Sequence, residues 1–266
     1  MRKRVATGVL GGIGFLTLLW LGGWWYAGLI ILLATAAYAE FCRMKAVRLN
    51  TPQTLIGLML VWLLLGSGLA AHELVAPVWL LHDPENLLFG MILFLLWVVI
   101  SRNQFQINEM AYLFFGSIYI GYGFSYMLQT RLVTEGMAWS LWVLAVTWAN
   151  DTGAYFIGRK WGKRKLWPAV SPNKTREGSL GGLLLSLVVS WGLLAFFPQL
   201  GEWWTVTGLA LLIGVAGQLG DLVESAIKRT TGVKDSGSLL PGHGGILDRF
   251  DSLLFVFPIL HIIHLV

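Results

Sequence analysis

The sequence predicts an all-α, polytopic integral membrane protein, and its composition, its long apolar segments and its charge placement each support that fold class. Hydrophobic residues make up 56% of the 266 residues and charged residues only 12%, against roughly 45–50% and about 25% in soluble globular domains. Such a chain has too little polar surface to cover a water-soluble particle. Its 32 glycines and 14 tryptophans suit close helix packing and anchoring at the membrane interface.

Nine apolar segments are candidate membrane spans, because a span needs roughly 20 mostly apolar residues. We expect them at 5–21, 24–40, 54–71, 87–101, 107–128, 138–157, 179–197, 204–227 and 250–265. The apolar segment 74–82 is short and is interpreted as a re-entrant or interfacial piece. The apolar stretch 5–39 is much longer than the hydrophobic region of a signal peptide, roughly 7–15 residues. We therefore expect it to be retained as a two-helix hairpin.

Basic residues set the expected orientation, because Lys and Arg concentrate in cytoplasmic loops. With the N-terminus in the cytoplasm, all but one of the 19 Lys and Arg residues lie at the start of the chain or in cytoplasmic loops, and the exception is Arg131. The outer loop 72–86 carries acidic residues and no Lys or Arg. The net charge of +5 is explained by this orientation, so we expect no nucleic-acid partner.

Polar residues divide the chain into two regions. Residues 1–137 hold few polar groups within their candidate spans, and we expect them to form an N-terminal transmembrane scaffold. Residues 148–251 concentrate acids, lysines and glycines, and we expect residues 138–266 to form a C-terminal transmembrane catalytic region with cytoplasmic loops. The only cysteine, Cys42, excludes an intramolecular disulfide and a metal cage of cysteines.

Two polar segments lie at neighbouring cytoplasmic ends of the expected spans. In the first, Asp151 shares a helical face with Tyr155; alternatively, it is an interfacial acid paired with Arg159. The second is the loop 171–179, in which Lys174 could hold phosphates and glycines after Glu177 expose backbone N–H groups at a helix start. The alternative is a basic loop that only marks topology, with a serine capping the next helix.

A third segment places four polar side chains on one helical face, since Asp221, Glu224, Ser225 and Lys228 follow helical spacing. Two carboxylates near the cytoplasmic end of a span suit a hard divalent cation with oxygen ligands. The alternative is a neutral helix pair of Glu224 with Lys228. That pair would leave Asp221 without a local partner.

The fourth segment, 234–251, combines glycines with further carboxylates. Glycines around His243 allow the backbone to approach a ligand closely. Asp248 and Asp251 lie one turn apart at the start of the last expected span. Together with Asp221 they would provide three carboxylates from two helices, which predicts a Mg²⁺ site with positions left open for substrate phosphates.

Carboxylates, basic residues and glycine loops at the cytoplasmic face favour phosphoryl or nucleotidyl transfer to a lipid. A cation-coupled transporter is the alternative from another class, and its acids would coordinate ions midway through the bilayer. Here most polar residues lie in or beside cytoplasmic loops. This placement favours an enzyme.

A motif over residues 225–251 resembles the signature of the phosphatidate cytidylyltransferases, also called CDP-diacylglycerol synthases. It reads Ser225-Ala226-Ile227-Lys228-Arg229, then Lys234-Asp235, then Pro241-Gly242-His243-Gly244-Gly245-Ile246-Leu247-Asp248-Arg249-Phe250-Asp251. The upstream segments 150–155 and 171–178 are similar to the family's other recurrent blocks. The resemblance by motif therefore covers residues 150–251.

The resemblance implies that CTP and phosphatidic acid react to give CDP-diacylglycerol and pyrophosphate with Mg²⁺ as cofactor. It also implies a homodimer among the lipids of a bacterial inner membrane, with the active site facing the cytoplasm. A second, monovalent cation such as K⁺ is compatible with so many carboxylates.

Carried over by position, the resemblance gives three sets of site residues. The metal ligands would be Asp221, Asp248 and Asp251. The catalytic set would add Lys228 and Arg249 to these three. The substrate-binding set would be Asp151, Lys174, Glu177, Glu224, Ser225, Arg229, Lys234, Asp235, His243, Gly244 and Gly245.

Polyprenol and dolichol kinases are the remaining enzymatic alternative, because they are similar to this family in their CTP-binding parts. A lipid alcohol must be deprotonated to react, so a kinase would require a clear general base. The phosphate of phosphatidic acid is already anionic at pH 7. Its transfer reaction depends on positioning and on compensation of charge between two polyanions, and the complete signature favours this reaction.

Overall fold

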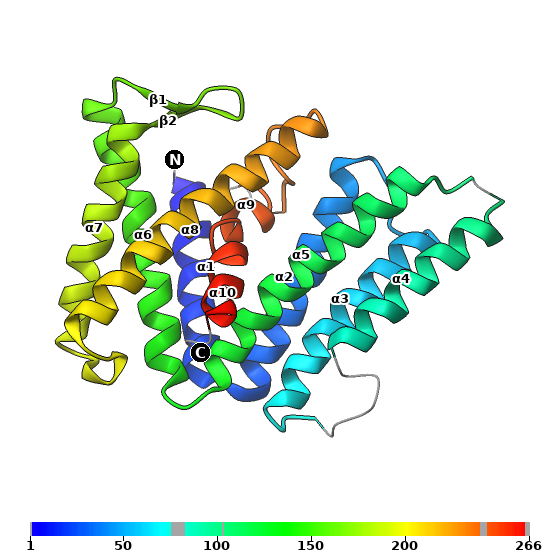
Figure 1. Ribbon diagram of the computed structural model, residues 1–266, viewed down its shortest axis with the longest axis horizontal. Coiled ribbons are helices and arrows are strands. Elements are labelled where there is room, and N and C mark those ends of the chain that lie inside the picture. Colours follow the sequence, from blue (N-terminus) through cyan, green and yellow to red (C-terminus); the bar gives the residue numbers. More distant parts are fainter. Residues whose placement is uncertain (1, 76–82, 103, 240–243, 264–266) are drawn as a thin grey trace. The chain divides into compact units, whose positions relative to one another are not determined.

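The computed structural model describes residues 2–75, 83–102, 104–239 and 244–263, and these residues are mostly helical, as predicted (Figure 1). They form ten α-helices, one short 3₁₀ helix and a two-stranded sheet. The helices are α1 (Arg2–Leu21), α2 (Gly23–Met44), α3 (Pro52–Ala71), α4 (Asp83–Ile100), α5 (Ile107–Leu132), α6 (Gly136–Trp161), α7 (Arg176–Leu194), α8 (Trp203–Thr230), α9 (Leu247–Phe250) and α10 (Leu253–Ile262). The strands are β1 (Lys165–Trp167) and β2 (Ser171–Thr175), and the 3₁₀ helix is Pro198–Leu200.

Four of these helices, α2, α3, α7 and α8, are long and apolar enough to cross a membrane, and α1, α4 and α10 contain shorter apolar stretches. The expected last span 250–265 is instead interrupted between α9 and α10. With ten residues and a rise of 1.5 Å per residue, α10 is about 15 Å long, half the thickness of the hydrocarbon core. Most of the segment 74–82 lies outside the described residues.

The chain forms two compact units. The first comprises residues 1–132 and 235–249, and the second comprises residues 133–234 and 250–266. The first division, after Leu132, lies close to the boundary at 137 that the sequence suggested. Segment 235–249 packs with the N-terminal unit, although it belongs by sequence to the C-terminal half.

The N-terminal unit is held together by small and polar side chains between α2, α3 and α5. A Cβ added to Gly57 of α3 would fall onto the Tyr38 hydroxyl of α2, so the two helices approach closely at this point. The Ser125 hydroxyl of α5 donates to the Leu64 carbonyl of α3 over 2.8 Å. The Tyr112 hydroxyl of α5 donates to the carbonyl of Phe41 over 2.8 Å.

Arg131, the exception to the charge asymmetry, has a structural role at the end of α1. Its Nε donates to the Leu19 carbonyl over 2.8 Å and its Nη2 to the Trp20 carbonyl over 3.3 Å. The last carbonyls of a helix lack partners within the helix and carry partial negative charge. Arg131 satisfies two of them, which explains a cation outside the cytoplasmic loops.

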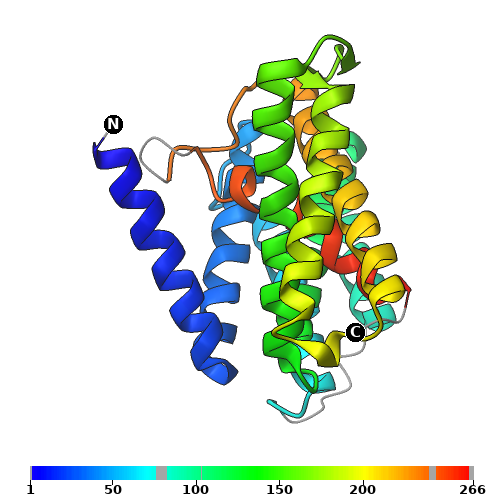
Figure 2. The same cartoon turned by 90° about the vertical axis from the view of Figure 1, so that its left-hand side faces the viewer.

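In the C-terminal unit, α6 and α7 run side by side, and the β1–β2 hairpin lies at their shared end (Figure 2). A Cβ added to Gly153 of α6 would lie 2.7 Å from the Gly181 carbonyl oxygen of α7, so small residues allow this contact. The antiparallel hairpin pairs Lys165 with Thr175. The sequence predicted only a loop here, because the strands are only three and five residues long.

The helix that follows the hairpin begins with a threonine cap, and not with the serine suggested by the sequence. The Thr175 side chain accepts a hydrogen bond from the Gly178 N–H over 3.1 Å. The Arg176 N–H donates to the Arg164 carbonyl over 2.8 Å. These two bonds fix the direction in which the hairpin enters α7.

Several tryptophans connect helices and do not serve only at the membrane interface. Trp142 of α6 is fully buried, and its Nε1 donates to Ser190 of α7 over 3.0 Å. Trp62 of α3 donates in the same way to Thr35 of α2 over 3.0 Å. The expectation of an interfacial role therefore does not hold for Trp142.

We expect Arg131→Met to destabilise the protein, because two carbonyls at the end of α1 lose their donor. The cost should be about 1.5–3 kcal/mol, the range for a hydrogen bond to a charged group. Thermal unfolding in detergent should show Tm lowered by about 3–12 °C. Arg102→Met, at an exposed position of the same unit, is the control; an equal shift in both variants would contradict this role.

Candidate active site

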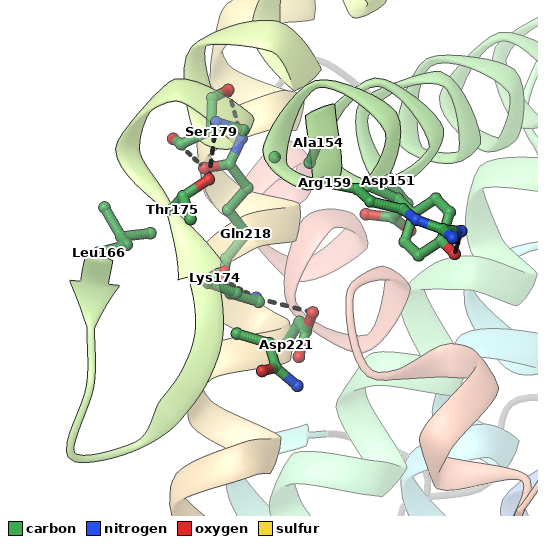
Figure 3. A pocket seen from close by; sticks show the side chains of 13 residues that line it. Asp151, Ala154, Arg159, Leu166, Lys174, Thr175, Ser179, Gln218 and Asp221 are labelled. Atoms are coloured by element: carbon green, nitrogen blue, oxygen red, sulfur yellow. Dashed lines mark hydrogen bonds and ion pairs between the residues drawn. The ribbon is translucent and has the colours of Figure 1, made fainter. Parts of the chain in front are cut away.

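A cavity of about 480 Å³ opens in the C-terminal unit, between the hairpin, the C-terminal part of α6, the first turn of α7 and the interior of α8 (Figure 3). This volume lies within the range of roughly 300–1,000 Å³ that is typical of small-molecule sites. The lining residues are Asp151, Ala154, Tyr155, Gly158 and Arg159 of α6, Leu166 of β1, Asn173, Lys174 and Thr175 of β2, Gly178 and Ser179 of α7, and Gln218 and Asp221 of α8.

An ion pair between Lys174 and Asp221 crosses this cavity, and the two side chains point toward one another in Figure 3. The Lys174 Nζ lies 2.7 Å from Asp221 Oδ2, and the side chains are 23% and 36% exposed. Nζ also donates to the Gln218 carbonyl over 3.4 Å. The sequence left Asp221 without a local partner; its partner comes from the hairpin, and Ser225 donates to its other oxygen over 3.3 Å.

A network around Gln218 supports this ion pair. The Gln218 Nε2 donates to Asn150 Oδ1 over 2.9 Å and to the Ser179 carbonyl over 3.1 Å. The Ser179 hydroxyl donates to Gln218 Oε1. Sequence analysis missed Gln218, although a signal was present, since it lies three residues before Asp221 on the same helical face.

Asp151 belongs to the same cavity. It interacts electrostatically with Asp221 and with Lys174. The positive charge of Lys174 therefore acts on both carboxylates, although its ion pair is with Asp221. Arg159, the alternative partner of Asp151, donates instead to the Tyr155 hydroxyl over 3.0 Å. The structure thus brings together two of the predicted substrate-binding residues, Asp151 and Lys174, with the predicted metal ligand Asp221.

Further along α8, Glu224 and Lys228 form the helix pair that the sequence offered as an alternative. Glu224 Oε2 lies 2.5 Å from Lys228 Nζ, and the two side chains are only 2% and 12% exposed. Asp251 interacts electrostatically with both Asp221 and Glu224. The C-terminal unit therefore gathers several carboxylates around α8, with Lys174 and Lys228 as the paired cations.

Glu177 has a structural role at the base of the hairpin. Its exposed carboxylate accepts hydrogen bonds from the Lys163 N–H over 3.0 Å and from the Arg164 N–H over 3.1 Å. These contacts hold the chain before β1 against the first turn of α7. A role of Glu177 in substrate binding stays a prediction.

In the N-terminal unit, Asp248 organises the segment that carries most of the signature. Its Oδ2 accepts from the Ser236 N–H over 3.0 Å, from the Ser236 hydroxyl over 2.9 Å and from the Gly245 N–H over 2.8 Å. Gly244 has a φ of 78°, a conformation that favours glycine. His243 lies outside the described residues.

Sequence analysis also missed Glu40 of α2, which is buried beneath this segment. It accepts hydrogen bonds from the Ile246 and Leu247 N–H groups over 3.0 and 3.1 Å. The missed signal was an acid within the candidate span 24–40, where a charge is costly unless it has partners.

Four further residues of the predicted substrate-binding and catalytic sets are on the surface. Arg229, Lys234, Asp235 and Arg249 are exposed. Their roles stay predictions.

The predicted metal ligands are distributed over both units. Asp221 and Asp251 belong to the C-terminal unit, whereas Asp248 belongs to the N-terminal unit. Among the residues that the structure describes, no group of three or more His, Cys, Asp or Glu side chains is close enough to hold a metal ion. A site with all three carboxylates as ligands stays a prediction.

Comparison with known proteins places these residues in a family. Residues 2–266 match the cytidylyltransferase family. A protein named phosphatidate cytidylyltransferase from Bacillus subtilis (strain 168) is 42% identical over 265 residues, which cover 98% of this chain and 96% of the relative. A protein of the same name from Staphylococcus haemolyticus (strain JCSC1435) is 39% identical over 264 residues, covering 99% and 98%. The chain belongs to the cytidylyltransferase family.

Proposed function

We propose that this chain is a phosphatidate cytidylyltransferase that transfers a cytidylyl group from CTP to phosphatidic acid, giving CDP-diacylglycerol and pyrophosphate. The observation that carries this proposal is the similarity over the full length to proteins of that name. A cavity lined by apolar helices and the hairpin, with the ion pair of Lys174 and Asp221 inside it, supports the same conclusion. Such a place suits a reaction between a soluble nucleotide and a membrane lipid.

The reaction needs charge compensation more than it needs a base. A phosphate oxygen of phosphatidic acid attacks the α-phosphorus of CTP, and the bond from that phosphorus to the bridging oxygen of pyrophosphate breaks. The attacking oxygen is already anionic, so no proton has to be removed. Lys174 and Arg159 line the cavity and would hold phosphates by charge-assisted hydrogen bonds.

The carboxylates of the C-terminal unit fit Mg²⁺ in their donor chemistry. Asp221 and Asp251 offer oxygen ligands and repel each other electrostatically, which favours a cation between or beside them. Mg²⁺ usually takes only one or two protein carboxylates and fills its other positions with water and substrate phosphates. Asp221, Asp251 and Asp248 are the ligands that we propose, and K⁺ is a candidate second cation. When bound, Mg²⁺ would neutralise phosphate charge.

The proposed setting is the inner (cytoplasmic) membrane of a bacterium; the bacterial source of the relatives supports the organism class. Four helices are long enough to span it and three contain shorter apolar stretches. The charge asymmetry of the sequence supports nine crossings with the N-terminus and the active site facing the cytoplasm. We also propose a homodimer, a scaffold role for residues 1–137 and a catalytic role for residues 138–266.

The activity can be tested with protein purified in detergent and assayed in mixed micelles with CTP, Mg²⁺ and either phosphatidic acid or a polyprenol. We expect pyrophosphate release and labelled CDP-diacylglycerol only with phosphatidic acid, and no turnover without Mg²⁺. CDP release with the polyprenol would indicate a kinase instead. Folded protein that turns over neither lipid would overturn the enzymatic proposal and favour the transporter alternative.

We expect Asp221→Asn to lower kcat by about 10²–10³-fold, the cost typical of removing one electrostatic group from an active site. The substitution keeps the shape of the side chain but removes the charge that pairs with Lys174. Glu202→Gln, at the exposed opposite end of α8, is the matched control and should stay within about 2-fold. Similar losses in the two variants would contradict a specific role for Asp221.

We expect Lys174→Met to reduce kcat/KM for CTP by about 10²-fold, because the cavity loses a cation that is aimed into it. The matched control is Lys165→Met, an exposed lysine on the other strand of the same hairpin. Steady-state kinetics with varied CTP would measure both variants. Equal effects would show that only the total positive charge of the hairpin matters.

A further inference from the structure

Glu40 places a carboxylate with three donors inside the N-terminal unit. The side chain is 2% exposed. Its Oε1 accepts from the Ile246 N–H over 3.0 Å, and its Oε2 accepts from the Leu247 N–H over 3.1 Å and from the Ser236 hydroxyl over 3.2 Å. Both oxygens are therefore used, and all three donors belong to the segment 235–249, which lies far from Glu40 in the sequence.

Two glycines of the segment, Gly237 and Gly245, lie against this carboxylate. A Cβ added to Gly237 would lie 2.7 Å from Glu40 Oε1. A Cβ added to Gly245 would fall onto Glu40 Oε2 and the Ser236 hydroxyl. Glycine at both positions allows the backbone to reach the carboxylate, and for Gly245 this is a reason for a signature glycine that does not involve a ligand.

Ser236 connects Glu40 to Asp248. Its hydroxyl lies 3.2 Å from Glu40 Oε2 and 2.9 Å from Asp248 Oδ2, and one hydroxyl proton can serve only one acceptor at a time. Asp248 is held as well by the N–H groups of Ser236 and Gly245. Both carboxylates thus accept hydrogen bonds from the segment 235–249. Glu40 does so from α2, and Asp248 is itself part of the segment.

We infer that Glu40 is a positioning residue, which holds the 235–249 loop in the conformation that presents Asp248 to the reaction. This inference rests on the proposed function in one respect, the role of Asp248 as a metal ligand. Partners that orient metal ligands typically affect metal affinity or activity by about 10–100-fold. Glu40 itself touches neither substrate nor metal in this arrangement.

Glu40→Gln is a precise test, because the amide keeps the shape but offers only one acceptor oxygen. Its NH₂ group would face a donor, so at least one of the three hydrogen bonds is lost. We expect hydrogen exchange of the amides in 235–249 to accelerate at least about 10-fold. We further expect the Mg²⁺ concentration for half-maximal activity to rise about 10–100-fold, with kcat partly restored by excess Mg²⁺.

The matched control is Glu85→Gln, an exposed acid of the same unit, which should change neither measurement. Ser236→Ala is the second variant, since it removes the shared hydroxyl but keeps the amide donors to Glu40. It should give a smaller change of the same kind, and it decides the question if Glu40→Gln does not fold.

Hydrogen exchange and Mg²⁺ dependence distinguish a failure of the inference on Glu40 from a failure of the proposed function. Normal exchange and normal Mg²⁺ dependence in Glu40→Gln would overturn the inference. A lower fraction of active protein with unchanged Mg²⁺ dependence would also overturn it, because that result indicates only a folding role. Failure of the wild type to turn over phosphatidic acid would overturn the proposed function, while the exchange measurement would still test the contact of Glu40 with the loop.

Discussion

A carboxylate in an apolar helix is stable only where donors or cations surround it, and this constraint governs both units of the protein. With charged residues at 12% of the chain, few cations are available to meet it. In the C-terminal unit, Lys174 forms an ion pair with Asp221, and Lys228 forms one with Glu224. In the N-terminal unit, Glu40 is satisfied by two backbone N–H groups and a hydroxyl.

These requirements determine where the polar loops lie. The β1–β2 hairpin must reach α8 to place Lys174 beside Asp221, and Glu177 and the Thr175 cap fix its base. The cavity follows from that placement, since its walls are the hairpin and the neighbouring parts of α6, α7 and α8. A polar site in an apolar protein is thus a consequence of how its buried charges are paired.

The helical architecture was predictable because hydrophobic runs and their periodicity are local properties of the sequence. Of the two ion pairs around α8, only one could be predicted from the sequence. Spacing along α8 identified Glu224 with Lys228, four residues apart, but it could not identify Lys174 as the partner of Asp221, because that contact depends on how the hairpin folds. The contact of Glu40 spans a far longer distance in sequence, since it accepts a hydrogen bond from the Ile246 N–H, 206 residues away. No local pattern carries such a contact.

The same long-range contact means that a residue of the proposed site depends on the N-terminal unit. Segment 235–249 leaves the C-terminal unit after Lys234 and returns at Phe250, and between these points it is bound to α2 through Glu40. Under the proposed function, Asp248 therefore depends on the N-terminal unit for its conformation, whereas Asp221 depends on the hairpin of the C-terminal unit. The N-terminal unit then contributes directly to the chemistry, because an unanchored 235–249 segment would carry the signature residues without holding them in place.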